Sequence, residues 1–141
     1  MVTLKAVGDL MLGDHPLMVG RGIAELTDAR DENYPFGGVG DALAGADLVF
    51  GNLEGAFRDL TGPLARLDRA CATSHRMAGR LRETGFGVLS LANNHSLQHG
   101  PAIFEDTIAT LHDAGIAVAG LRGRTHRHCQ PVDLDLEGLP L

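Results

Sequence analysis

The sequence predicts an α/β fold, in which a parallel or mixed β-sheet is flanked by helices. Short apolar runs that end in glycine or asparagine alternate with longer segments whose apolar residues recur at helical spacing. This alternation is typical of β-α-β units around a parallel sheet. The chain has 141 residues, of which 44% are hydrophobic, and such a chain buries one core, as a domain or part of one.

The first two expected strands each end at a glycine. Residues 3–7 form an apolar run that stops at the turn Gly8-Asp9. Residues 41–46 are expected to form a short helix, and residues 47–50 a second strand. That strand is expected to stop at Gly51-Asn52, because both residue types are depleted in strands and favoured in turns.

Helices and strands also alternate in the second half of the chain. Residues 75–84 have the apolar spacing of a helix that Gly85 ends, and residues 86–91 follow as a third strand. Pro101 is well placed as the first residue of a helix that runs to residue 114. Residues 116–119 then complete the predicted sheet as its fourth strand.

The charge and hydropathy of the chain exclude two classes of partner. The formal net charge is -6 and no concentrated basic face is present, which argues against binding of nucleic acid. No apolar run approaches the roughly 20 residues that a membrane span needs. The first seven residues reach Gly8-Asp9 too soon to supply a signal peptide, so the visible sequence carries no export address.

Three of the expected strands are followed by side chains of the metal-ligand type. Asp9 follows the first strand, Asn52 and Glu54 follow the second, and Asn94 and His95 follow the third. The carboxyl ends of parallel strands share one edge of an open sheet, where ligands bind. Singly, each residue is equally well explained as a turn former or a solvated side chain. Together they predict a divalent metal site, with oxygen and imidazole donors that suit Mn, Fe or Zn.

Three segments around these residues carry a family likeness. They are residues 8–13 (GDLMLG), residues 51–55 (GNLEG) and residues 90–100 (SLANNHSLQHG). In this order they resemble the N-terminal signatures of the CapA family, the poly-γ-glutamate capsule synthesis proteins. The resemblance implies a role in capsule biosynthesis at the bacterial cell envelope. It also implies that residues 1–141 are the N-terminal half of a single CapA-like domain; the compartment of this chain is left open.

The CapA family is distantly similar to the calcineurin-like metallophosphoesterases. That similarity implies a truncated version of their layered sandwich, with Asp9, Asn52, Glu54 and Asn94 as ligands of a divalent metal. It also implies that His95 is catalytic, as a general acid or as a hydrogen-bond donor to the substrate oxygen. The implied substrate is a phosphoester or an anionic polymer.

Three positions depart from these family patterns. Met11 stands where the phosphoesterases have a histidine ligand, and Asn52 stands where they have a bridging carboxylate. Gln98 replaces the acidic residue that the CapA family usually has three positions after His95. The histidine-rich ligand segments of the family's second half would lie beyond residue 141. Whether this chain is an enzyme is therefore left open.

Two alternatives to a metal-dependent hydrolase also stay open. One is a non-catalytic component of capsule assembly that binds an anionic polymer or a partner at the same edge, and the other is an inactive fragment. Residues 131–141 are expected to form a strand, a tight turn and the beginning of another strand. A hairpin cut short in this way predicts a fragment with an exposed edge, through which the chain self-associates.

Overall fold

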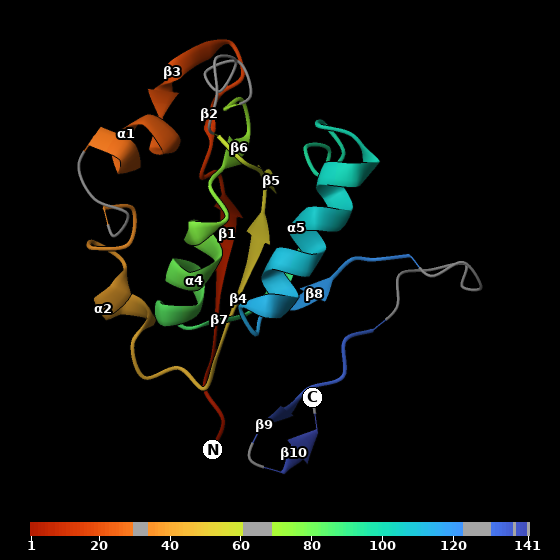
Figure 1. Ribbon diagram of the computed structural model, residues 1–141. Helices are drawn as coiled ribbons and strands as arrows, with labels where there is room; N and C mark the ends of the chain where they lie inside the picture. The colour runs from red at the N-terminus through yellow and green to blue at the C-terminus, as the bar shows by residue number, and fades with distance from the viewer. Residues whose placement is uncertain (30–33, 61–68, 123–130, 137, 141) are drawn as a thin grey trace.

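The centre of the computed structural model, which describes residues 1–29, 34–60, 69–122, 131–136 and 138–140, is a four-stranded sheet. Its strands are β1 (Leu4–Leu10), β4 (Leu48–Leu53), β7 (Phe86–Ser90) and β8 (Ala117–Ala119). Each strand pairs in parallel with the next, in the order β1-β4-β7-β8 (Figure 1). The predicted α/β fold is confirmed, and the carboxyl ends of all four strands lie along one edge.

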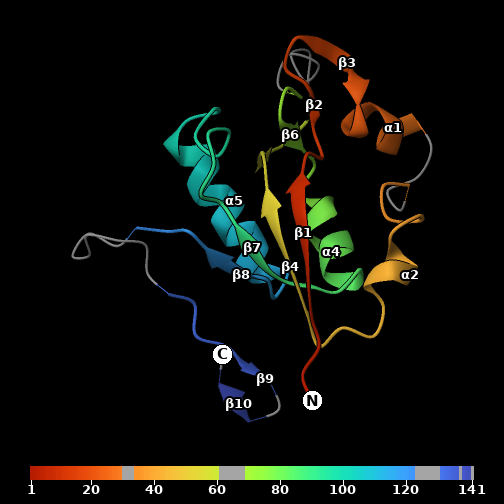
Figure 2. The same ribbon diagram turned by 180° about the vertical axis from the view of Figure 1, so that it is seen from behind.

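Two helices cover one face of this sheet. They are α4 (Arg76–Glu83) and α5 (Pro101–Asp113), which lie in front of the strands in Figure 1 and behind them in Figure 2. Gly85 and Gly115 follow these helices with φ of 105° and 74°, a left-handed conformation that glycine adopts without steric cost. In the part of the chain that the structure describes, no helix is long and apolar enough to cross a membrane.

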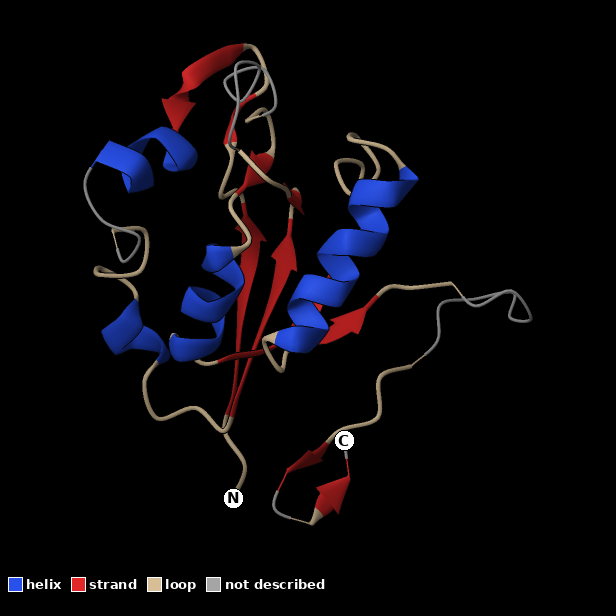
Figure 3. Ribbon diagram, viewed as in Figure 1, coloured by secondary structure: helices blue, strands red, loops and turns tan. Residues whose placement is uncertain are grey.

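Short elements, shown in Figure 3, lie in the connections between the main strands and after the last of them, and most were not predicted from the sequence pattern. The helix expected at residues 41–46 is the single turn α2 (Gly40–Leu43), and the expected C-terminal hairpin forms as the antiparallel pair β9 (Asp135–Leu136) and β10 (Leu139–Pro140). The unpredicted elements are β2 (Asp14–His15), β3 (Met18–Gly22), α1 (Ile23–Ala29), β5 (Ala56–Phe57) and β6 (Ala72–Thr73).

The core lies between the sheet and its two covering helices. Strands β4 and β7 supply Val49, Leu53, Phe86 and Leu89, and the helices contribute side chains such as Leu81; all are at most 1% exposed. Full burial of such a side chain stabilises the fold by about 1.5–3 kcal/mol. This packing fixes the strands, and with them the edge at which they end.

Two strands run further than the sequence pattern predicted. The first reaches Leu10 and the second reaches Leu53, so Asp9 and Asn52 lie inside strands rather than after them. The two residues face each other as partners in the register of β1 and β4. Gly51 does not stop its strand, because its role is close packing: a Cβ atom there would lie 3.0–3.1 Å from three neighbouring side chains. The correction places both residues on rigid strands.

Candidate functional site at the strand ends

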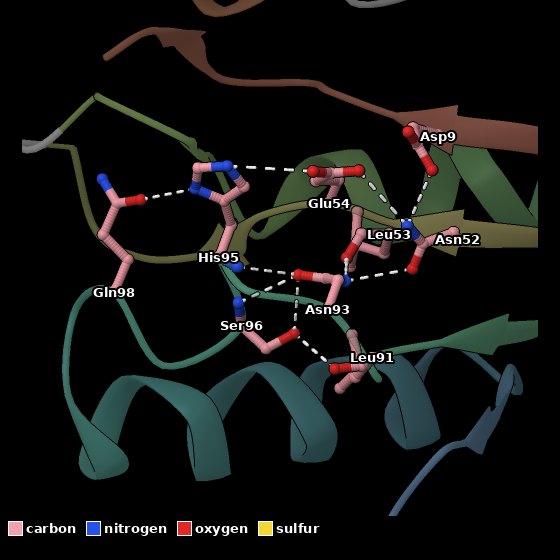
Figure 4. A network of polar contacts seen from close by, with 9 residues as sticks. All are labelled: Asp9, Asn52, Leu53, Glu54, Leu91, Asn93, His95, Ser96 and Gln98. Carbon is pink, nitrogen blue, oxygen red and sulfur yellow. Dashed lines mark hydrogen bonds and ion pairs between the residues drawn. The ribbon is translucent and has the colours of Figure 1, made fainter.

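Four of the five residues predicted for the site lie together (Figure 4). Asn52 donates from Nδ2 to Oδ1 of Asp9 at 2.8 Å and to Oε2 of Glu54 at 3.3 Å. His95 Nε2 lies 3.7 Å from Oε1 of Glu54. Asp9 comes from β1, Asn52 from β4, Glu54 from the residue after β4, and His95 from the loop after β7. We call these four residues the strand-end group.

The fifth predicted residue, Asn94, lies outside the strand-end group. It is exposed and lines a cavity of about 800 Å³ between the loop after β7 and α5. The residue before it, Asn93, contacts the group instead. Asn93 donates from Nδ2 to Oδ1 of Asn52 at 3.0 Å and to the carbonyl oxygen of Leu53 at 2.8 Å. Asn93, which the sequence analysis did not name as a site residue, is thus the asparagine that contacts Asn52.

Asn93 also shapes the loop that carries His95. Its Oδ1 accepts hydrogen bonds from the backbone N–H groups of His95 and Ser96, both at 3.0 Å. The Ser96 hydroxyl, which is buried, donates to the carbonyl oxygen of Leu91. Asparagine commonly bonds backbone groups a few residues ahead in this way. That habit is the signal by which Asn93 could have been found from the sequence.

A glutamine orients the His95 ring. His95 Nδ1 lies 2.7 Å from Oε1 of Gln98. An amide oxygen only accepts hydrogen bonds, so Nδ1 carries a proton. In the neutral ring the lone pair is therefore on Nε2, which points toward Glu54 (Figure 4). Gln98 thus supplies an acceptor without a charge at the position where the CapA family usually has an acidic residue.

The electrostatics of the strand-end group centre on Glu54. Burial raises the pKa of this carboxyl above its ordinary value, and a hydrogen bond with Asp9 and the charge of Asp9 raise it further. The nearby His95 acts in the opposite direction. The side chains of Glu54 and His95 are only 18% and 21% exposed, so solvent screens them incompletely. Two carboxyls held this close favour a proton, a hydrogen-bond donor or a cation between them.

Glycines in two motif segments hold the loop under Glu54. A Cβ atom at Gly13 would lie 2.3 Å from the backbone nitrogen of Ala72, and one at Gly55 would lie 2.5 Å from the carbonyl oxygen of Cys71. Neither position has room for a side chain. Cys71 itself adopts φ of 53°, a conformation rare outside glycine. The backbone at Gly13 and the backbone at Gly55 therefore both pack closely against residues 71–72, and this contact positions the end of β4.

The donors of the strand-end group fit one divalent cation better than a bridged pair. Among the described residues, no three His, Cys, Asp or Glu side chains converge on a common point that would hold a metal ion. Asn52 turns its amide nitrogen, rather than its oxygen, toward the carboxylates. Asp9 and Glu54 remain, and hydrated cations such as Mg²⁺ bind through one or two carboxylates and water. Carboxylate and water ligands also suit Mn²⁺.

Comparisons with known proteins identify a family that covers nearly the whole chain. The family model described as bacterial capsule synthesis protein PGA_cap matches residues 3–141. The chain belongs to this family. It is 30% identical over 124 residues to the capsule biosynthesis protein CapA of Bacillus anthracis, and the match covers 84% of this chain and 28% of that protein. It is 32% identical over 124 residues to the uncharacterized protein y4sH of Sinorhizobium fredii, and this match covers 84% of this chain and 24% of that protein.

The match to these relatives is partial in length. The PGA_cap chain described here spans about a quarter of the length of the curated relatives that it matches. Membership in the family and the α/β fold follow from the comparison and the structure. The activity, substrates and partners of a whole capsule protein do not.

Proposed function

We propose that this chain acts in bacterial capsule synthesis and that its strand-end group binds one divalent cation for metallophosphoesterase-like hydrolysis. Its membership in the PGA_cap family and its likeness to a capsule biosynthesis protein support the capsule role. One observation supports the proposed cation binding and hydrolysis. Asp9 and Glu54 are joined through one amide group, with His95 3.7 Å from Glu54.

Each side chain has a distinct task in this proposal. Asp9 and Glu54 would hold the cation, while Asn52 donates to both carboxylates without being a ligand. The chemistry that a cation of the Mn²⁺ type would supply there is polarisation of a phosphoryl oxygen and a lowered pKa of a water molecule. When both ring nitrogens of His95 are protonated, Nε2 would deliver its proton to the leaving oxygen, while Gln98 accepts from Nδ1 and keeps the ring in this orientation.

The anionic substrate class follows from the same charges. An acidic group alone repels a phosphoester or a segment of polyglutamate, so a cation is needed between the carboxylates and the substrate. Manganese is the natural first probe, because it suits carboxylate and water ligands and belongs to the metals that the motifs predict.

A second candidate function is the non-catalytic binding of an anionic polymer during capsule assembly. The cavity of about 800 Å³ beside the strand-end group favours it, because it is large enough for several polymer residues. Its lining mixes apolar side chains, such as Leu97 and Phe104, with polar ones, including Asn94 and Arg122. In this case the polymer would lie against α5, and none of its bonds would be broken.

Hydrolysis of a simple phosphodiester with Mn²⁺ distinguishes the two candidates. We expect the protein to hydrolyse a phosphodiester whose leaving group is an alkoxide, and the variant His95→Ala to lose about 10²- to 10⁴-fold in kcat, because general acid catalysis contributes that much when the leaving oxygen needs a proton. His75→Ala is the matched control, because His75 forms an ion pair with Asp106 at the helices, outside the strand-end group. Absence of hydrolysis together with retention of polyglutamate on a column would replace the first candidate with the second.

A further inference from the structure

We infer that Asn93 fixes the amide of Asn52 so that the strand-end group takes one divalent cation rather than a bridged pair. The inference rests on the proposed cation site and deepens it. It starts from the direction of the hydrogen bonds that join Asn93, Asn52 and the two carboxylates (Figure 4). Those directions are determined by backbone groups, which cannot exchange the roles of donor and acceptor.

The orientation of the Asn93 amide follows from three backbone partners. The N–H groups of His95 and Ser96 donate to one of its atoms, which must therefore be the oxygen. The carbonyl oxygen of Leu53 accepts from the other atom, which must therefore be the nitrogen. Both ends of the amide give the same answer. Reversing it would break all three bonds and leave unsatisfied groups at partly buried positions.

The orientation of the Asn52 amide follows from that of Asn93. Nδ2 of Asn93 donates to Asn52 at 3.0 Å, so the accepting atom is Oδ1 of Asn52. The Asn52 nitrogen is left to face Asp9 at 2.8 Å and Glu54 at 3.3 Å. If the Asn52 amide turned over, its NH₂ group would face the NH₂ group of Asn93, and its oxygen would face two carboxylates. The loop after β7 thereby dictates which atom β4 presents to the site.

This orientation limits the charge that the group can hold. An amide NH₂ with partial positive charge stands between the carboxylates, where a pair of dications would need an anionic bridge. Asp9 and Glu54 together carry two negative charges when ionised, which balance one dication. Asn93 is thus a positioning residue that acts through Asn52, and Asn52 is a hydrogen-bond donor rather than a ligand.

Titration of the protein with Mn²⁺, followed by calorimetry, tests the stoichiometry. We expect one ion per chain for the native protein, and one ion bound at least as tightly by Asn52→Ala, since no ligand is lost. Asn52→Asp supplies the missing anionic bridge and should raise the number to two. Two ions on the native protein, or a tenfold weaker Kd for Asn52→Ala, would overturn the inference. Zero ions on the native protein would instead refute the cation site of the proposed function.

Nuclear magnetic resonance of the metal-free protein tests the orientation separately. Asn93→Asp keeps the oxygen that the loop N–H groups need and replaces the donor to Asn52 with an acceptor. The Asn52 amide should then turn over, and its side-chain N–H resonances should shift in both Asn93→Asp and Asp9→Ala. Asn94→Asp adds the same charge one residue away and should leave them in place. If Asn52 is unaffected by Asn93→Asp and Asp9→Ala, its nitrogen does not face the carboxylates and the inference is wrong.

Discussion

Two regions of this molecule satisfy their carboxylates in opposite ways. Asp14, at the start of β2, is fully buried, and its oxygens accept from the backbone N–H groups of Gly20 at 2.8 Å and Glu25 at 3.2 Å. In the strand-end group, by contrast, Asp9 and Glu54 share the NH₂ group of one side chain, and Asp9 is exposed. One carboxylate is enclosed by the backbone, and the other two are held by a single side chain at the edge where the strands end.

The difference separates a structural acid from a candidate ligand. Asp14 joins β3 to the first turn of α1, where a carboxylate also meets the positive end of the helix. Each of its two oxygens accepts from a backbone N–H group within the fold. The carboxylates of Asp9 and Glu54 lie at the edge where strands end, and burial and mutual charge raise the pKa of Glu54. A group whose charged form is disfavoured by the protein gains most from binding a cation.

Replacing Asp14 and Asp9 by alanine, one at a time, should give the largest difference in the free energy of unfolding between the two regions. Asp14→Ala should lower the free energy of unfolding by about 3 kcal/mol, because two backbone N–H groups lose a charged acceptor in a buried place. Asp9→Ala should change it by less than about 0.5 kcal/mol, since the residue is exposed. Urea denaturation of both variants measures this. Equal losses for the two variants would show that the environments of these carboxylates do not differ in the way described.

The sheet was predictable from the sequence, whereas the region around Asp14 was not. Strands β4 and β7 are apolar runs of ordinary length, and their helices end at glycines that a local pattern reveals. β2 and β5 have two residues each, too few for any periodicity. Their pairing depends on contacts far along the chain, such as the N–H of Asp14 donating to the carbonyl of Arg69. No local spacing contains that information.

The strand-end group was predictable as a set but not in its hydrogen bonds. Parallel pairing alone brings Asp9, Asn52 and Glu54 to one edge, and the Asn-Asn-His motif points to the loop that adds His95. The choice between Asn93 and its neighbour depends on how that loop turns after β7. The direction of the Asn52 amide depends in turn on that choice. A sequence names the residue types, whereas donor and acceptor roles require the folded contacts.

The raised pKa of Glu54 predicts a smaller, pH-dependent effect on stability. Its carboxyl binds a proton more tightly in the folded chain than in the unfolded chain, where its pKa has the ordinary value of 4.5. Between the two values the native state holds more protons, so the free energy of unfolding falls as pH rises through this window. Glu54→Gln should remove that contribution. Urea denaturation of the metal-free protein between pH 4 and 8 measures it, and a constant difference between protein and variant would contradict the prediction.

Cys71 joins the two regions, and the reactivity of its thiol tests the contact between them. The N–H of Cys71 donates to the carbonyl of Asp14. Burial raises the pKa of the Cys71 thiol, and the charge of Glu54 also raises it, whereas a hydrogen bond with Gln98 lowers it. A raised pKa leaves less thiolate at pH 8, so iodoacetamide should modify Cys71 at least about tenfold more slowly in the folded protein than in urea. The variant Cys129→Ser removes the other thiol, which lies outside the described residues. Equal rates in both states would mean that this thiol is open to solvent and that the backbone contact beneath Glu54 is not closed.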